Sequence, residues 1–366
     1  MILFVIAAAL MNWSAIFRVQ NIMNVSFRAK QTNRPTAAAI EMAPKKATIP
    51  RYNYTRPDTA DQWPKVAWLM SFPNSGTSYT GTLVRRATLT VTASNYGYSN
   101  LDNHGNSTPL FEWSPIGPFI TDPKIERNKM PRGESYILTK THCGGTCFGC
   151  PPKHYLQTQE EFEADCLQSD YKEDSKKKKA IYDPSIVSKA VHLIRNPFDN
   201  VVSRFHLKRN QMKGRADEDW LSSYPNTKTG FQEFCSYVNN KFQSQEKDVI
   251  IGNSGRNLFV EYQNVPCVSD FIRYIQWHNH AVHTTNKMDI ETVVLHYEDY
   301  GIDHKKTTNG LLDFLGLNIT HHVEKFKVGR GGYIDRFEPD EIESVKSLVM
   351  ELATEDTWIL LKRYFV

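Results

Sequence analysis

The sequence predicts a three-layer α/β/α fold with a mainly parallel central sheet and a P-loop-like strand-loop-helix unit. An apolar run at residues 66–70 predicts a buried strand, and a loop of small residues at 71–78 leads from it into a helical pattern at 79–88. A second apolar run at residues 190–194 ends just before Pro197, whose missing N–H suits a helix start. The 366 residues are also enough for one well-buried α/β domain.

Composition narrows the classes of function. Hydrophobic residues make up 40% of the chain and charged residues 23%, as in an ordinary globular protein. The net charge is only +4, which excludes a nucleic-acid binder that relies on overall charge. A modest basic excess is compatible with an anionic ligand.

Two segments precede the predicted main domain at residues 61–366. Residues 1–17 are almost entirely apolar and are interpreted as a signal peptide or a signal anchor, with a buried leader as the alternative. The segment lacks a basic start, and Arg18 and Arg28 follow it, which argues against an anchor with a cytosolic N-terminus. Residues 18–60 contain several prolines and little periodicity, so we interpret them as a disordered stem or linker.

The loop after the first strand predicts an anion cradle. It ends in Asn74, Ser75, Gly76, Thr77 and Ser78 and opens the following helix. Successive backbone N–H groups and a helix N-terminus favour negative charge at one point. The loop is not a Walker A sequence, because no Lys follows Gly76, and a nucleoside triphosphate is therefore the less natural ligand.

Arg195 and Ser203 form a second candidate group. Arg195 lies at the carboxyl end of the strand at residues 190–194, and Ser203 lies eight residues later on the predicted helix. In open α/β sheets, ligands bind at the carboxyl ends of the strands. The Arg guanidinium and the Ser hydroxyl are therefore expected to bind one phosphate.

Further segments complete the expected architecture. An apolar strand at residues 136–138 is followed by Lys140 and His142, and a strand at 293–296 is followed by Tyr297. Residues 327–332 form a Gly-rich loop that begins with a lysine. Residues 338–365 have Glu, Leu and Val at helical spacing and predict a pair of surface helices.

In four of these segments the chain resembles the sulfotransferases that use 3′-phosphoadenosine 5′-phosphosulfate (PAPS). The loop at residues 71–78 is similar to the family's 5′-phosphosulfate loop, and Arg195 to Ser203 is similar to its 3′-phosphate motif. Residues 140–142 resemble its Lys-Thr-His triplet, and residues 327–332 resemble the late loop that closes over the cofactor. The matches occur in the family's order and together span roughly residues 65–337.

The resemblance implies a role for each candidate residue, with PAPS as the sulfate donor, PAP as the product and no metal. His142 would be the general base for a hydroxyl or amine acceptor, and Lys140 would stabilise the sulfuryl oxygens. The residues implied at the cofactor are Asn74, Ser75, Gly76, Thr77 and Ser78 for the 5′-phosphosulfate, Tyr79 and Tyr297 for the adenine, and Arg195, Ser203, Lys327, Gly329, Arg330, Gly331 and Gly332 for the 3′-phosphate.

Departures from the family pattern keep two other functions open. Asn74 stands where many members have Lys or Arg, so one alternative is a catalytically weak relative that binds PAP or a glycan. Lys327 stands where the family favours Arg, and Lys binds phosphate as a point charge rather than a fork. The other alternative is a P-loop small-molecule kinase, against which the missing Lys after Gly76 argues.

Residues 143–180 form a Cys-rich and Lys-rich insertion. The even number of cysteines and their irregular spacing favour disulfides over a zinc site. The six cysteines of the whole chain are Cys143, Cys147, Cys150, Cys166, Cys235 and Cys267, and the first four lie in this insertion. The lysine-rich residues 172–179 predict a solvated loop, with a docking strip for an acidic glycan as the alternative.

Disulfides and an apolar leader favour a location in the Golgi or another secretory-pathway membrane, with the catalytic domain in the lumen. A carbohydrate acceptor is then the first expectation, and a cytoplasmic location is the alternative. Sequons that would carry glycans in the lumen occur at Asn12, Asn24, Asn53, Asn106 and Asn318.

Overall fold

A strand, a tight loop and a helix open the part of the chain that the computed structural model describes. The described part of the chain comprises residues 65–99, 101–122, 130–131, 133–145, 157–243, 258–322, 326 and 332–365. The predicted leader and stem lie outside these residues, as do Cys147, Cys150 and most of the late loop. The domain boundaries therefore stay predictions.

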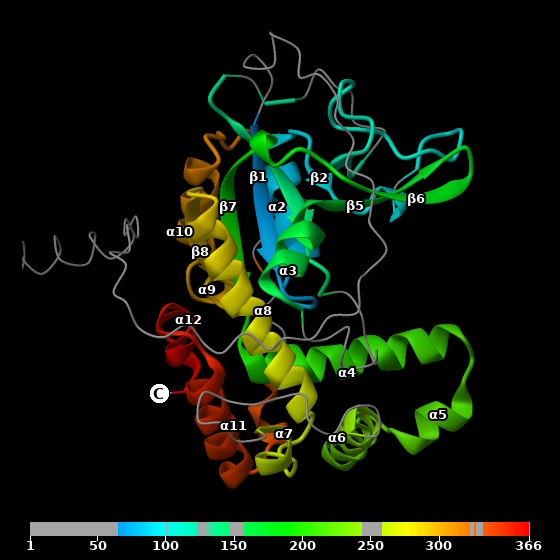
Figure 1. Cartoon of the computed structure of the whole chain (residues 1–366), viewed down its shortest axis with the longest axis vertical. Helices are drawn as coiled ribbons and strands as arrows, with labels where there is room; N and C mark the ends of the chain where they lie inside the picture. The colour runs from blue at the N-terminus through cyan, green and yellow to red at the C-terminus, as the bar shows by residue number, and fades with distance from the viewer. Residues whose placement is uncertain are drawn as a thin grey trace, which may run out of the picture. The chain divides into compact units, whose positions relative to one another are not determined.

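Strands and helices are interspersed along the described chain, as in an α/β fold (Figure 1). The strands are β1 (Lys65–Ser71), β2 (Ala93–Ser94), β3 (Phe119–Ile120), β4 (Tyr136–Thr141), β5 (Gln168–Glu173), β6 (Lys176–Ile181), β7 (Val187–Ile194) and β8 (Glu291–His296). The α-helices are α2 (Thr77–Thr88), α3 (Gln159–Leu167), α4 (Pro197–Gly214), α5 (Glu218–Ser223), α6 (Lys228–Gln243), α7 (Leu258–Glu261), α8 (Val268–Lys287), α9 (Asp299–Ile302), α10 (His304–Phe314), α11 (Pro339–Leu352) and α12 (Glu355–Leu361). Short 3-10 helices are η2 (Gly97–Ser99), η5 (Pro184–Ile186), η6 (Tyr333–Arg336) and η7 (Lys362–Tyr364).

The main sheet has the strand order β3-β2-β4-β1-β7-β8. β1 pairs in parallel with β4 and β7, β2 is parallel to β4, β8 is parallel to β7, and β3 is antiparallel to β2. The register places Leu69 beside both Lys140 and Val191. The carboxyl ends of β1, β4 and β7 therefore lie at one edge of the sheet, where α/β proteins bind their ligands.

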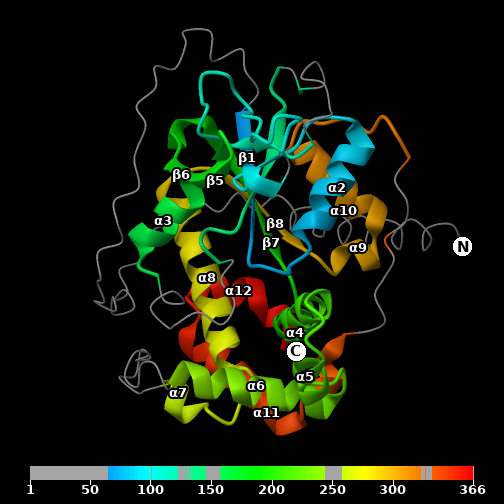
Figure 2. The same ribbon diagram turned by 90° about the vertical axis from the view of Figure 1, so that its right-hand side faces the viewer.

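Helices cover both faces of the sheet, which gives the predicted three layers. On one face, Leu69 of β1 belongs to an apolar cluster with Leu83 of α2 and Leu311 of α10. On the other face, Trp68 belongs to a larger cluster that includes Trp277 of α8. Figure 2 shows α2, α9 and α10 on one side of the strands, with α3 and α8 on the other. Because successive residues of β1 are buried on opposite faces, its residues 66–70 are continuously apolar.

The predicted strands and helices are confirmed, with changes at their ends. The helix expected from residue 79 begins two residues earlier, at Thr77. The predicted helix pair at residues 338–365 is α11 and α12, which bury Val345, Leu348 and Leu361.

The prediction of a solvated loop at residues 172–179 is wrong, because these residues form most of the β5–β6 hairpin (Figure 1). Its lysines are largely exposed, as expected, but acidic partners lie across the strand pair. Lys178 forms an ion pair with Glu173, and Lys179 lies 3.3 Å from Asp170. Opposite charges across the ladder support a strand where the local sequence suggests only a charged loop.

Two disulfides are present in the described residues. Cys143–Cys166 joins the residue after His142 to α3, and Cys235–Cys267 joins α6 to the residue before α8. The predicted preference for disulfides over zinc is therefore confirmed for these four cysteines. The described chain contains no group of three or more His, Cys, Asp or Glu residues arranged to hold a metal.

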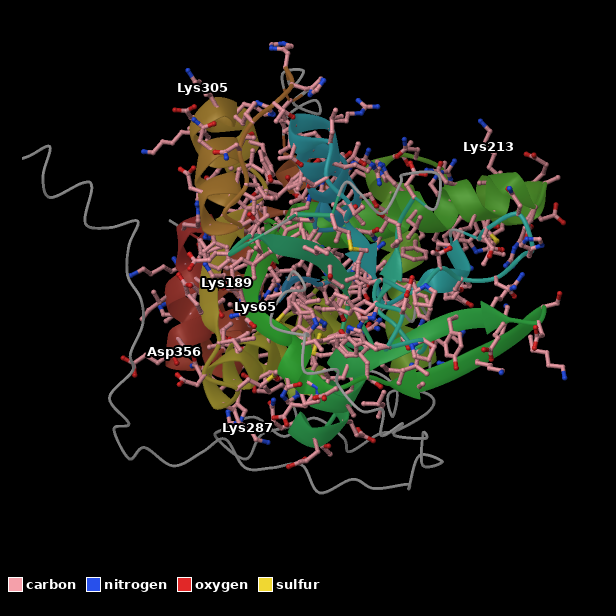
Figure 3. All side chains as sticks on the ribbon, turned by 90° about the horizontal axis from the view of Figure 1, so that it is seen from above. Lys65, Lys189, Lys213, Lys287, Lys305 and Asp356 are labelled. Carbon is pink, nitrogen blue, oxygen red and sulfur yellow. A yellow bond between two sulfur atoms is a disulfide. The ribbon has the colours of Figure 1, made fainter. Side chains whose placement is uncertain are left out.

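Charged side chains are spread over the surface. Lys213 on α4 and Lys305 on α10 point outward from the ribbon (Figure 3). Lys287 on α8 instead contacts Glu163 on α3, at 2.8 Å. Within the described ranges, no helix combines the length and the apolar character needed to span a bilayer.

Candidate active site

The loop between β1 and α2 has the backbone of an anion cradle. Gly76 is the N-cap of α2, with a φ of 98°, and no side chain caps this helix end. The first backbone N–H groups of α2, from Thr77 and Ser78 onward, therefore have no capping side chain and can donate to an anion. A Cβ at Gly76 would lie 2.1 Å from Cδ2 of Tyr297, so only glycine lets the loop pass this ring.

Asn74 has three features that bear on this loop. Its φ of 68° is in the left-handed region, which Asn tolerates better than most residues. Its backbone oxygen accepts a hydrogen bond from Arg195 Nη1 at 2.8 Å. Its side-chain Nδ2 is buried and has no hydrogen-bond partner in the structure. A buried donor of this kind is a candidate ligand contact.

Arg195 and Ser203 lie together, as expected from their spacing. Arg195 Nη1 donates to Ser203 Oγ at 3.0 Å, and the guanidinium lies 5.2 Å from the centre of the Tyr297 ring. Tyr274 fixes the backbone at this point by donating its hydroxyl to the Arg195 oxygen at 2.5 Å. The carboxyl end of β7 and the start of α4 are thus held next to the loop after β1.

The end of the late loop reaches the same place. Gly332 precedes η6, and the backbone N–H of Tyr333 donates to Asp199 Oδ1 on α4 at 2.7 Å. This contact brings the segment after the late loop to the helix that carries Ser203. Lys327, Gly329, Arg330 and Gly331 lie outside the described residues.

Tyr79 and Tyr297 belong to one aromatic group. The ring of Tyr79 lies 6.2 Å from Tyr297, 5.1 Å from Tyr300 and 4.8 Å from Phe326, each edge-on. Its hydroxyl contacts Nε2 of His304 at 2.9 Å. Burial raises the pKa of Tyr79 to about 12, so its hydroxyl keeps its proton. The group provides apolar ring faces beside the first turn of α2.

His142 lies at the end of β4 and contacts the end of β1. Its Nδ1 is 2.8 Å from the backbone oxygen of Ser71. A carbonyl oxygen can only accept, so Nδ1 carries the proton and Nε2 keeps a lone pair in the neutral ring. The backbone oxygen of His142 accepts from Trp277 Nε1 at 2.8 Å, and its N–H donates to the Tyr96 hydroxyl at 3.0 Å.

Ser71 connects His142 to the loop between β1 and α2. The Ser71 hydroxyl lies 2.6 Å from the hydroxyl of Thr77, the first residue of α2. One residue thus contacts both the imidazole and the helix N-terminus. A proton acceptor and an anion cradle therefore meet at the carboxyl end of β1.

The comparisons with known proteins agree with this geometry. A family model described as "Sulfotransferase domain" matches residues 64–330, which is more than half of the chain. The chain belongs to the sulfotransferase domain family.

A solved structure shows a weak overall likeness to this sulfotransferase. It is the crystal structure of a sulfotransferase from Alicyclobacillus acidocaldarius, with 12% sequence identity and a TM-score of 0.32, and the match covers 82% of this chain and 95% of that chain. No curated protein sequence matches the chain. Membership of the family therefore rests on the family model.

The electrostatics of the candidate site keep the His142 imidazole neutral. Burial, and then the charge of Lys140, lower the pKa of His142 to about 3. The imidazole is therefore neutral at ordinary pH with an unprotonated Nε2, but the same surroundings make it a weak base in the free protein. Burial also lowers the pKa of Lys140, whose ammonium lies 5.7 Å from the centre of the Tyr96 ring. Tyr96 in turn stacks on His142 with ring centres 5.7 Å apart.

Sequence reasoning missed three residues that hold the segments of the candidate site together. Asn200, in the first turn of α4, donates its Nδ2 to Pro73 O at 2.9 Å and to Ser75 Oγ at 3.0 Å. Glu298 accepts from the backbone N–H of Asn196 at 2.8 Å. Asp199 holds η6, as described above. The local signal was limited to the polar residues in the first turn of α4.

Proposed function

We propose that this sulfotransferase moves a sulfuryl group from PAPS to a hydroxyl or amine acceptor and releases PAP. The meeting of His142 and α2 at Ser71 carries the proposal. An acceptor beside Nε2 of His142 would also lie beside the N–H groups that would hold the donor's 5′-phosphosulfate. Such an arrangement supplies proximity and charge stabilisation, which are the main needs of this transfer.

The residues present fit the donor. Asn74 Nδ2 and Arg195 Nε are buried donors without hydrogen-bond partners in the structure, and α2 has no capping side chain. The loop after β1 would bind the 5′ end, and Arg195 with Ser203 would bind the 3′-phosphate. Tyr79 and Tyr297 would bind the adenine between these two points. The bound donor supplies the activated sulfuryl group.

His142 performs the proton transfer in this proposal. Its Nε2 accepts the proton of the acceptor hydroxyl, while Nδ1–H stays bonded to Ser71 O and fixes the ring. The acceptor oxygen forms the new bond to sulfur, and the bond between sulfur and the bridging oxygen breaks. The leaving phosphate takes the negative charge that develops on this oxygen.

In this proposal Lys140 and Asn74 together replace the cation that many family members carry in the loop after β1. Many family members have Lys or Arg at the position of Asn74, which can donate a hydrogen bond but supplies no charge. Lys140 is close enough to His142 to lower its pKa, so it brings a positive charge to this part of the site. We assign the stabilisation of the sulfuryl oxygens to Lys140, with Asn74 Nδ2 as a neutral donor.

A carbohydrate acceptor and a secretory location are part of the proposal. The two disulfides favour an oxidising compartment, where glycans are the abundant hydroxyl acceptors. The apolar residues 1–17 favour entry into that pathway. These features support the substrate class and not an individual glycan.

Ligand-dependent thermal stabilisation of the full chain tests the donor. PAP, AMP and ATP are titrated in parallel, because AMP lacks the 3′-phosphate that Arg195 and Ser203 are proposed to bind. We expect PAP to stabilise the protein more than AMP or ATP. Equal responses, or a response to ATP alone, would overturn PAPS as the donor and favour a kinase.

Transfer of labelled sulfate from PAPS tests the reaction and the acceptor class. Desulfated glycans, simple phenols and tyrosine-containing peptides are compared as acceptors under identical conditions. We expect label in the glycan and little in the phenol or the peptide. PAP binding without transfer to any acceptor would favour the catalytically weak relative.

A further inference from the structure

Three cationic or protonatable side chains near the proposed 3′-phosphate site have unpaired nitrogen atoms. The atoms are Arg195 Nε, His206 Nε2 and Arg336 Nη1, each buried and without a hydrogen-bond partner among the described residues. They come from three segments: the end of β7, the helix α4 and the 3-10 helix η6. Because unpaired buried polar atoms cost free energy, three of them in one region indicate a binding site for a shared acceptor.

Contacts between α4 and η6 bring these side chains to one place. Ser203 and His206 are three residues apart on α4 and therefore lie on the same helix face. Ser203 accepts from Arg195 Nη1 at 3.0 Å. The His206 ring lies 5.1 Å from the ring of Tyr333, which begins the 3-10 turn that ends at Arg336.

The groups around His206 are mainly cations. Burial, and then the charges of Arg336, Arg209 and Arg195, lower the pKa of His206. Arg209 is already engaged, because its Nη1 donates to the backbone oxygens of Leu221 and Tyr224. Arg336 and Arg195 keep the unpaired atoms named above.

Two other titratable groups belong to the same surroundings. The carboxylate of Asp199 accepts from the backbone N–H of Tyr333, and the Tyr333 ring faces His206. Neither is among the groups that shift the pKa of His206 in either direction. Cations therefore dominate the electrostatics at this imidazole, and a bound dianion would reverse their effect.

We propose that Arg195, His206 and Arg336 form one site for a phosphomonoester dianion, and that His206 takes up a proton when the dianion binds. The inference rests on the proposed function, in which this dianion is the 3′-phosphate of the donor. It adds His206 and Arg336 to Arg195 and Ser203 as residues that bind this phosphate. His206 and Arg336 would then decide the preference for PAP over AMP.

Proton uptake gives the binding a definite pH dependence. The free protein holds His206 neutral, and phosphate binding raises its affinity for a proton. Binding is therefore strongest at low pH and weakens as the pH rises through the pKa of His206 in the complex. Between the free and bound pKa values, the affinity changes by up to about tenfold per pH unit.

Isothermal titration of the full chain with PAP and AMP tests the proposal. Titrations between about pH 6 and about pH 8 cover the range of a perturbed histidine, and buffers with different ionisation enthalpies report the protons taken up. The variants are His206→Gln, His206→Ala and Arg336→Gln. The control is His321→Gln, which changes an exposed histidine that contacts the far end of α2.

We expect proton uptake with PAP in the unchanged protein and in the His321→Gln control, but not in His206→Gln. Glutamine keeps a donor but cannot gain a charge, so this variant also corrects for titration of the phosphate itself. His206→Ala and Arg336→Gln should each weaken PAP binding by about tenfold while AMP binding changes by less than about twofold.

The outcomes separate this inference from the proposed function. If the unchanged protein binds AMP as well as PAP, the proposed donor is wrong. If it prefers PAP but His206→Gln and Arg336→Gln keep both the preference and the proton uptake, then the phosphate lies elsewhere and this inference is overturned. The conservative glutamine variants keep the test valid where His206→Ala fails to fold.

Discussion

The two halves of the candidate site are held in different ways. On the donor side, hydrogen bonds between distant segments fix the loop: Arg195 donates to Asn74, and Asn200 donates to Pro73. On the base side, His142 is only 8% exposed, and the Cys143–Cys166 disulfide holds the adjoining residue. The half proposed to bind the sulfate donor has cationic side chains with unpaired N–H groups, whereas the half around His142 has a neutral imidazole.

This difference shows how one sheet edge supports two kinds of chemistry. A dianion needs donors that keep their protons, and arginine and a helix N-terminus supply them. Burial next to Lys140 keeps the His142 imidazole neutral but also lowers its pKa, so proton transfer to it requires the negative charge of the bound donor to raise that pKa. Changes on the two sides should therefore separate donor affinity from turnover.

The largest expected effect is on the base side. His142→Ala should lower kcat by about a thousandfold, because a general base contributes on the order of a hundredfold to ten-thousandfold. PAP affinity should change by less than about twofold, because His142 is not assigned to the donor. Steady-state transfer assays and PAP titration provide the two measurements.

A second buried histidine serves as the control for His142. His192 on β7 contacts Nδ1 of His278 at 2.7 Å, and burial also lowers its pKa to about 3. His192→Gln should reduce stability more than kcat. Unchanged turnover in His142→Ala, or an equal loss of turnover in both variants, would exclude His142 as the base.

The disulfides test whether the base side depends on its covalent link. Replacing Cys143 and Cys166 together by Ser should lower the free energy of unfolding by about 3 kcal/mol, from the entropy of the opened loop. It should also lower kcat, because the residue after His142 is no longer held. Denaturant unfolding and assays of the folded protein measure the two effects.

The Cys235–Cys267 disulfide provides a matched control. It closes a loop of similar length, with a sequence separation of 32 against 23, but it links α6 to the start of α8. Its removal should cost a similar free energy of unfolding and leave kcat nearly unchanged. Equal losses of kcat for both pairs would mean that the disulfides act on stability alone.

On the donor side the expected effect is on affinity. Arg195→Ala should weaken PAP binding by about thirtyfold, because a charge-assisted pair to phosphate and the bond to Asn74 are both lost. Arg195→Lys should recover part of this affinity, since it restores the charge without the fork. Titration of PAP and AMP gives the result, and unchanged PAP affinity would disprove the assignment to the 3′-phosphate.

The sequence was informative where a function depends on neighbouring residues. The loop from Asn74 to Ser78 follows a run that only a buried strand explains, and Ser203 follows Arg195 at a helical spacing. Both groups could therefore be placed at the carboxyl ends of strands before the fold was known. The structure adds that Arg195 also bonds to Asn74, 121 residues earlier.

The contacts that were missed join segments far apart in the chain. Asn200 reaches Pro73 across 127 residues, and Tyr333 reaches Asp199 across 134. No local pattern encodes such pairs, because the packing of α4 and η6 determines them. The prediction of a loop at the lysine run of β6 was wrong for the same reason, since the partner strand β5 supplies the acidic side chains.

Asn74 belongs to both sides of the comparison and gives the smallest expected effect. Its backbone bonds to Arg195, whereas its buried Nδ2 has no hydrogen-bond partner among the described residues and is proposed to contact the transferred group. Asn74→Gly permits the φ of 68° and removes only the side chain, so PAP affinity should change by less than about twofold. The loss of one neutral donor should lower kcat by about fivefold.

Asn74→Lys provides the opposite change at the same position. It adds the cation that many family members have. If Lys140 alone does not fully stabilise the leaving group, Asn74→Lys should have a higher kcat than Asn74→Gly. Transfer assays on the three proteins decide between a neutral donor and no role at all. If Asn74→Gly keeps full kcat, Nδ2 does not contact the transferred group. The charge of Lys140 is then sufficient to stabilise the sulfuryl oxygens.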